Sequence, residues 1–158
     1  MSQIGSFREY FWVEAVLQIE SSRMENLIYT WVQIVHNFGA VAVIGSPAAA
    51  LSLSRQNQIV RYKLAWLMLL GWLAQGASGI GFALTSYTMK GALPEVTGIA
   101  LGALVLKVGC TFIGTVLTGF YLATRLRWSA AREHRMWQLM LLMTVSAITA
   151  AAFLRWYL

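Results

Sequence analysis

The sequence predicts an all-α integral membrane protein: an antiparallel up-and-down bundle of four transmembrane helices behind a short N-terminal interfacial segment. Two observations support this fold class. Four apolar stretches occupy most of the 158 residues, and charged residues make up only 11% of the chain. A helix needs about 20 mostly apolar residues to cross the hydrocarbon core, and each stretch meets that length.

The predicted spans cover residues 27–53, 64–89, 96–124 and 136–158. They are expected to be helices because any other isolated crossing would leave backbone polar groups unpaired in lipid. The gaps between them are short, so consecutive helices should pack antiparallel. A soluble domain of 17.6 kDa has too little interior to hide four such helices. Residues 26–158 therefore form one bundle, without room for a second domain.

Residues 1–25 form the expected interfacial segment. Its aromatic residues Phe7, Tyr10, Phe11 and Trp12 favour a position on the membrane surface or against a partner subunit. A signal peptide is not expected, because the segment lacks a basic start and Glu14 interrupts its apolar run.

The basic residues lie where membrane topology would place them. Lysine and arginine mark cytoplasmic loops, and the first and third gaps are rich in both: Arg55, Arg61 and Lys63 in one, and Arg125, Arg127, Arg132 and Arg135 beside Glu133 in the other. Both termini then lie on the opposite side, and the bacterial inner membrane is the expected location. The net charge of +6 thus requires no nucleic acid partner. Attraction to anionic lipid is the alternative interpretation of these clusters.

Two ionisable side chains lie inside the predicted spans. His36 is about nine residues into the first span and Lys107 about ten into the third, so both reach roughly 14 Å deep, near the membrane midplane. A basic group there costs about 2.5–3.5 kcal/mol, so it is rarely found without a use or a partner. All six acidic residues are glutamates outside the predicted spans, which leaves Lys107 without an internal counter-ion.

Three arrangements would accommodate Lys107: it is uncharged, it bonds to backbone carbonyls or to His36, Asn37 or Gln75, or it meets an acidic group of a ligand or partner. His36 is either a hydrogen-bonded interior histidine, a contact for a metal or tetrapyrrole, or a proton-handling group. A haem held by two histidines of this chain is not expected, because the second histidine, His134, lies in a predicted loop.

The sulfur-containing residues and the glycines form two further patterns, which are less specific than the placement of His36 and Lys107. Met136, Met140 and Met143 form a stripe on the fourth predicted helix, and Cys110 lies one turn from Lys107. Thiolate and thioether groups suit Cu(I), which suggests copper ligands at Cys110, Met140 and Met143, although methionine also fills apolar gaps. Gly98-x-x-x-Gly102 matches the close-approach pattern of membrane helices, either inside the bundle or as a docking face for another subunit.

Several short motifs resemble the copper-resistance protein D (CopD-like) superfamily, which includes the HemJ-type protoporphyrinogen oxidases. These motifs are Trp31-x4-His36-x2-Gly39, the stretch GASGIGFAL that ends the second span, and Leu104-Val-Leu-Lys107 before a basic exit. The resemblance implies a four-helix membrane fold. In the oxidases a first-helix histidine and a third-helix lysine are the functional pair, and those roles would fall on His36 and Lys107. The long polar first cytoplasmic loop of the oxidases has no equivalent here.

The leading functional hypothesis is a small, non-catalytic integral membrane subunit or accessory protein that packs against a larger complex, of respiratory or other electron-transfer type. Its partners would be the lipid bilayer and either other membrane subunits or further copies of itself. The alternative is a CopD- or HemJ-like protein that handles a tetrapyrrole (haem or porphyrin) or copper at His36 and Lys107, and a third hypothesis is a small-anion transporter. Hydrolase and nucleotide-binding motifs are absent from the sequence, so an enzyme is less expected unless it is a HemJ-like oxidoreductase.

Overall fold

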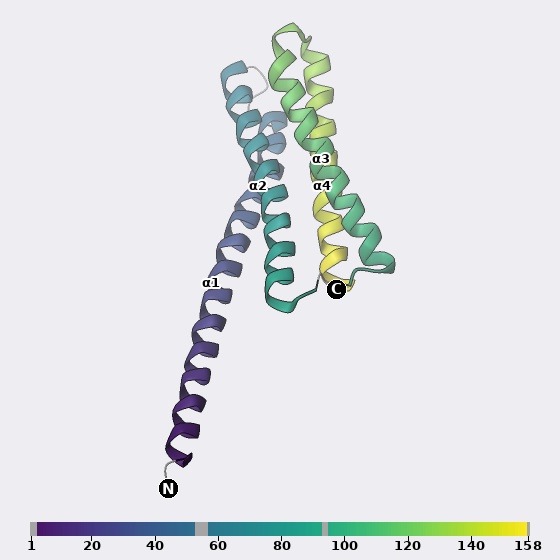
Figure 1. The fold of residues 1–158 in the computed structure, drawn as a ribbon. Helices are drawn as coiled ribbons and strands as arrows, with labels where there is room; N and C mark the ends of the chain where they lie inside the picture. Colours follow the sequence, from purple (N-terminus) through teal and green to yellow (C-terminus); the bar gives the residue numbers. More distant parts are fainter. Residues whose placement is uncertain (1–2, 53–56, 93–94, 158) are drawn as a thin grey trace.

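The computed structural model describes the backbone of residues 3–52, 57–92 and 95–157, and side chains from residue 20 onward apart from residues 21, 89 and 90. Four long helices make up this part of the chain: α1 (Gln3–Ser52), α2 (Gln58–Lys90), α3 (Gly98–Thr124) and α4 (Ala130–Tyr157), with a short 3-10 turn, η1 (Arg125–Arg127), after α3. They run alternately up and down and lie side by side (Figure 1). The predicted all-α four-helix bundle is confirmed.

Each helix contains a segment long and apolar enough to cross a membrane: Ser22–Ser52, Gln58–Thr88, Gly98–Arg127 and Ala130–Tyr157. Large apolar side chains such as Phe38, Val105 and Phe112 are exposed on the outside of the bundle. Such a surface is solvated by lipid tails and would be unfavourable in water. The chain is therefore an integral membrane protein.

Two helices begin earlier than their apolar stretches predict. We expected spans from residues 64 and 136, whereas α2 starts at Gln58 and α4 at Ala130. The Asn57 side chain caps α2 by accepting hydrogen bonds from the backbone N–H groups of Ile59 (3.0 Å) and Val60 (3.1 Å). Placing Glu133 in a gap was wrong: it lies on the first turn of α4 and is buried.

Glycine allows helices α1 and α2 to pack closely. A Cβ atom added to Gly71 would lie 2.9 Å from Val43 Cγ1, and one added to Gly39 would lie 3.1 Å from the carbonyl oxygen of Gly71. Deeper in the bundle, Gly114 of α3 leaves room for the Trp72 indole, which a Cβ at that position would overlap. Trp72, Tyr121 and Trp137 are fully buried in the core.

Helix α1 continues without a break from the predicted interfacial segment into the first span. Its N-terminal part projects beyond the other three helices (Figure 1). The position of this part relative to the membrane surface stays a prediction.

Candidate functional site

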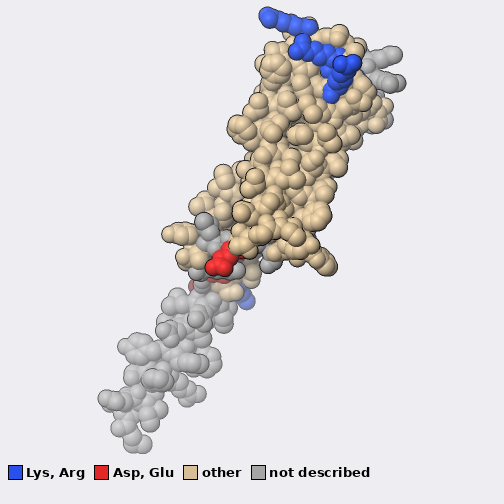
Figure 2. All heavy atoms as spheres, turned by 90° about the vertical axis from the view of Figure 1, so that its right-hand side faces the viewer, with Lys and Arg blue, Asp and Glu red and all other residues tan. Residues whose placement is uncertain are grey.

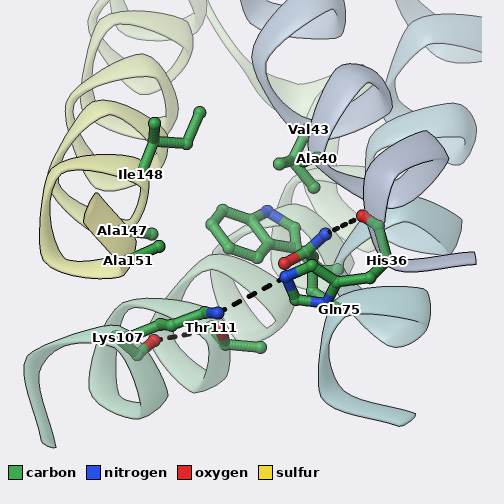
Figure 3. A pocket seen from close by; sticks show the side chains of 10 residues that line it. His36, Ala40, Val43, Gln75, Lys107, Thr111, Ala147, Ile148 and Ala151 are labelled. Atoms are coloured by element: carbon green, nitrogen blue, oxygen red, sulfur yellow. Dashed lines mark hydrogen bonds between the residues drawn. The ribbon is translucent and has the colours of Figure 1, made fainter. Parts of the chain in front are cut away.

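The structure brings His36 and Lys107 together. His36 Nε2 on α1 and Lys107 Nζ on α3 are 3.4 Å apart (Figure 3). Both side chains line a pocket of about 130 Å³ inside the bundle, and the remaining lining residues come from all four helices: Ala40, Val43, Trp72, Gln75, Thr111, Ala147, Ile148 and Ala151. We call this site the histidine pocket.

The hydrogen bonds around Ser78 favour one tautomer of a neutral His36 ring. Ser78 has a single hydroxyl proton, which it donates to a backbone carbonyl, that of Ala74 at 2.6 Å or that of Gln75 at 3.2 Å. The hydroxyl oxygen therefore accepts from His36 Nδ1, at 2.7 Å. Because Nδ1 carries the proton, the lone pair of Nε2 faces Lys107 and the pocket.

Helix α2 also holds His36 in place through two further residues. Gln75 Nε2 donates a hydrogen bond to the backbone carbonyl of His36. The Phe82 ring meets the imidazole edge-on, with 5.7 Å between centroids. Gln75 was one of the predicted possible partners of Lys107; it lines the same pocket, and its amide donates to the backbone of His36.

Lys107 brings hydrogen-bond donors to this pocket, and the Trp72 ring forms part of its wall. Within the described part of the chain Lys107 makes no ion pair, since the one salt bridge there joins Arg61 and Glu133. Trp72 Nε1 is buried and has no hydrogen-bond partner among the described residues. The walls add apolar groups from Val43, Ala147 and Ile148. A primary amine beside an apolar cavity favours a ligand that carries acceptor atoms or negative charge.

Asn37 lies outside this pocket. Its Oδ1 accepts a hydrogen bond from Gln33 Nε2 at 2.9 Å, and both amides are exposed on α1. Asn37 was predicted as a possible partner of Lys107, but it follows His36 directly, and neighbouring helical residues point about 100° apart.

The candidate copper ligands belong to the core. Cys110 and Met140 are buried in the apolar cluster that includes Trp72, and Met143 packs against it. None of these three residues lines the histidine pocket. The described residues contain no group of three or more His, Cys, Asp or Glu side chains that could hold a metal ion. Copper binding by the sulfur atoms stays a prediction.

The two glycines of the close-approach pattern have different environments. Gly98 begins α3 with a φ of +56°, a backbone conformation that favours glycine whatever packs nearby. Gly102 is exposed, and a Cβ added there would meet no atom within 4 Å. The glycine pattern is thus not used for packing inside the described bundle, and its use as a docking face stays a prediction.

A second polar cluster, which the sequence did not predict, joins α2, α3 and α4. Arg61 Nη1 lies 2.6 Å from Glu133 Oε2, and both side chains are buried. The Tyr121 hydroxyl donates to Glu133 Oε1, and Gln58 Nε2 donates to Oε2 at 3.2 Å. We call these four residues the glutamate cluster. The one available signal was that Glu133 is the single acid in a strongly basic stretch.

The fold and these two clusters define the class: a small four-helix integral membrane protein with an intramembrane polar pocket. No protein-family model matches the chain, and no curated protein or solved structure is significantly similar to it.

Proposed function

We propose that the histidine pocket binds the acidic group of a membrane ligand, and that this ligand is a tetrapyrrole with carboxylate side chains, as in the HemJ-type oxidases that the motifs resemble. The observation that carries the proposal is the Lys107 amine, 3.4 Å from His36 Nε2 in a pocket, with no ion pair among the described residues. A carboxylate placed there would receive a charge-assisted hydrogen bond from Lys107.

The size of the pocket decides which part of such a ligand it accepts. Its volume of about 130 Å³ is below the roughly 300–1,000 Å³ of sites that enclose a drug-sized molecule. It therefore suits an acidic arm better than a whole macrocycle. Ile148 lines the pocket and is 40% exposed, so the pocket reaches the outer surface of the bundle. The macrocycle would lie there, against the lipid.

Each residue then has a chemical role. Lys107 pairs with the carboxylate, and the Trp72 ring forms part of the pocket wall. His36 Nε2 presents a lone pair that can accept a proton, and Ser78 keeps the ring in the tautomer that does so. A bound tetrapyrrole would supply the redox chemistry of its macrocycle.

Binding of a porphyrin diacid and of its dimethyl ester tests the proposal, because the two differ at the carboxylates. We expect the wild-type protein in mild detergent to bind protoporphyrin at least about tenfold more tightly than the diester, which corresponds to about 1.4 kcal/mol. Lys107→Met should remove the difference. Gln33→Ala, an exposed change on the same helix as His36, serves as the control. Equal affinities for acid and ester in the wild type would contradict the proposal.

The accessory-subunit hypothesis remains as a second candidate because of the exposed amides of Gln33 and Asn37. They lie near the middle of the first span, on its outer surface. Amides between membrane helices commonly bond across the interface, so these two favour a partner subunit. Mass measurement after purification in mild detergent tests this. A monomer with no co-purifying protein would count against it.

We further propose that the basic end of the bundle faces the cytoplasm of a bacterial inner membrane. The asymmetry of lysine and arginine supports this orientation. Cysteines introduced at Arg127 and at Ala92, at opposite ends, would test it with a membrane-impermeant thiol reagent on intact cells. Labelling of the cysteine at residue 127 would place the basic end outside the cytoplasm and contradict the proposed orientation. Copper handling and anion transport have no supporting observation of their own among the described residues.

A further inference from the structure

The basic end of the bundle has more positive charge than its acids can neutralise. Lysine and arginine side chains gather where α1 leads to α2 and α3 leads to α4 (Figure 2). The described acid at this end, Glu133, already bonds to Arg61, Tyr121 and Gln58. The other described cations here make no ion pair in the described part of the chain: Lys63, Arg125, Arg127, Arg132 and Arg135.

Two of these arginines are held against aromatic rings. The guanidinium carbon of Arg125 lies 4.2 Å from the centroid of the Tyr62 ring, and that of Arg132 lies 4.8 Å from the Trp128 ring. The Trp128 ring in turn packs against Tyr121, with 5.6 Å between centroids. Stacking orients each planar guanidinium and leaves its N–H groups at the edge free to donate.

The two arginine–aromatic pairs lie at the ends of the membrane spans, and this level indicates which kind of ligand they would meet. Tyr62 and Trp128 lie near the ends of apolar spans, at the level where aromatic residues meet lipid headgroups. A phosphate diester at this level would accept hydrogen bonds from a guanidinium edge while its acyl chains extend along the exposed apolar surface. The buried Arg61–Glu133 pair joins α2 to α4, and Tyr62 and Arg132 are the residues next to its two members in the sequence.

We propose that Arg125 on Tyr62 and Arg132 on Trp128 form a binding site for anionic phospholipid headgroups. The site prefers phosphatidylglycerol-type lipid over zwitterionic phosphatidylcholine, because a headgroup without net charge does not compensate the positive charge of the two arginines. Lipid binding here is independent of the ligand proposed for the histidine pocket. Each arginine near an anionic surface contributes about a fivefold preference at low salt.

Native mass spectrometry from vesicles of equal phosphatidylglycerol and phosphatidylcholine tests this site. We expect the wild-type protein to retain phosphatidylglycerol preferentially, and Arg125→Gln with Arg132→Gln to reduce that preference by about tenfold or more. Arg125→Lys with Arg132→Lys keeps the charge but loses the stacked planar donors, and should fall between the two. Arg155→Gln, near the far end of α4, is the matched control and should retain the wild-type preference.

Three results would overturn the proposal. One is an unchanged lipid preference in the double glutamine variant whose melting temperature in phosphatidylcholine equals that of the wild type. Another is an equal loss of preference in Arg155→Gln, which would indicate a response to net charge alone. The third is displacement of the bound lipid by inorganic phosphate at matched ionic strength, which would make the site one for free phosphate.

Discussion

The two polar clusters of the bundle differ in whether their charged side chains form an ion pair. In the glutamate cluster, Arg61 and Tyr121 each bond to a different oxygen of Glu133, and the side chains of Arg61 and Glu133 are only 6% and 4% exposed. In the histidine pocket, Lys107 has a 3.4 Å contact with a ring nitrogen and no ion pair among the described residues. In one cluster both carboxylate oxygens are occupied, although Arg61 Nε has no hydrogen-bond partner among the described residues, and the other cluster borders a cavity.

This difference separates a structural role from a binding role. A buried carboxylate whose oxygens are occupied by its own protein has little capacity for a ligand, but removing one partner leaves a charge stranded. A cation with free donors beside a pocket can take a ligand without rearranging the fold. The glutamate cluster should therefore dominate stability, and the histidine pocket should dominate ligand affinity.

The largest expected effect is from breaking the glutamate cluster. Glu133→Ala leaves Arg61 buried without its carboxylate, and we expect the free energy of unfolding to fall by about 3–5 kcal/mol. Denaturant unfolding in mild detergent measures this. The double variant Arg61→Met with Glu133→Leu should recover most of the loss, because no unpaired charge remains. A double variant as unstable as Glu133→Ala would contradict the assignment of the loss to the stranded arginine.

The next effect concerns Trp72, which connects the apolar core with the histidine pocket. Gly114→Ala would place a Cβ in overlap with the indole, so the ring must move, and we expect a loss of about 1–3 kcal/mol in unfolding free energy. Gly102→Ala is the matched control on the same helix, because its Cβ would meet no atom within 4 Å. Equal stability of the two variants would show that Trp72 is not tightly held.

The sequence predicted most of the fold because hydropathy and length dictate how an apolar chain crosses a bilayer. It placed the starts of α2 and α4 about six residues late, because Arg61 and Glu133 look like loop residues until each is known to neutralise the other. Mutual neutralisation of residues 72 positions apart depends on how α2 and α4 pack, and no local pattern reports it.

The candidate site was also predicted in part: the sequence indicated the depth of its two ionisable residues but not the direction of the side chains around them. Counting residues along two spans predicted matched depths for His36 and Lys107, and their side chains do meet. The depth of a residue along its span does not tell which way its side chain faces, however. Ser78 and Trp72 border this site because of the way α2 rotates against α1 and α3, whereas Asn37 turns away despite its adjacent position.

Removal of the hydroxyl that orients His36 should have an intermediate effect, on binding more than on stability. Ser78→Ala leaves His36 Nδ1 without its acceptor, so the ring no longer prefers the tautomer that presents Nε2 to the pocket. Loss of such an orienting partner costs about tenfold or more at metal-binding histidines; we expect a loss of porphyrin affinity in the same direction, and porphyrin titration measures it. Thr88→Ala removes a hydroxyl that bonds to carbonyls of its own helix, and should leave affinity unchanged.

The smallest expected change in stability comes from Lys107→Met, although this variant should abolish the preference for an acidic ligand. The substitution removes one long hydrogen bond to His36, and such bonds between membrane helices average about 0.6 kcal/mol. It also removes the unfavourable placement of an amine in the membrane, so the two contributions oppose each other. We expect the unfolding free energy to change by less than about 1 kcal/mol in either direction. A loss as large as that of Glu133→Ala would show that Lys107 is as structural as the glutamate cluster, and the contrast between the two regions would disappear.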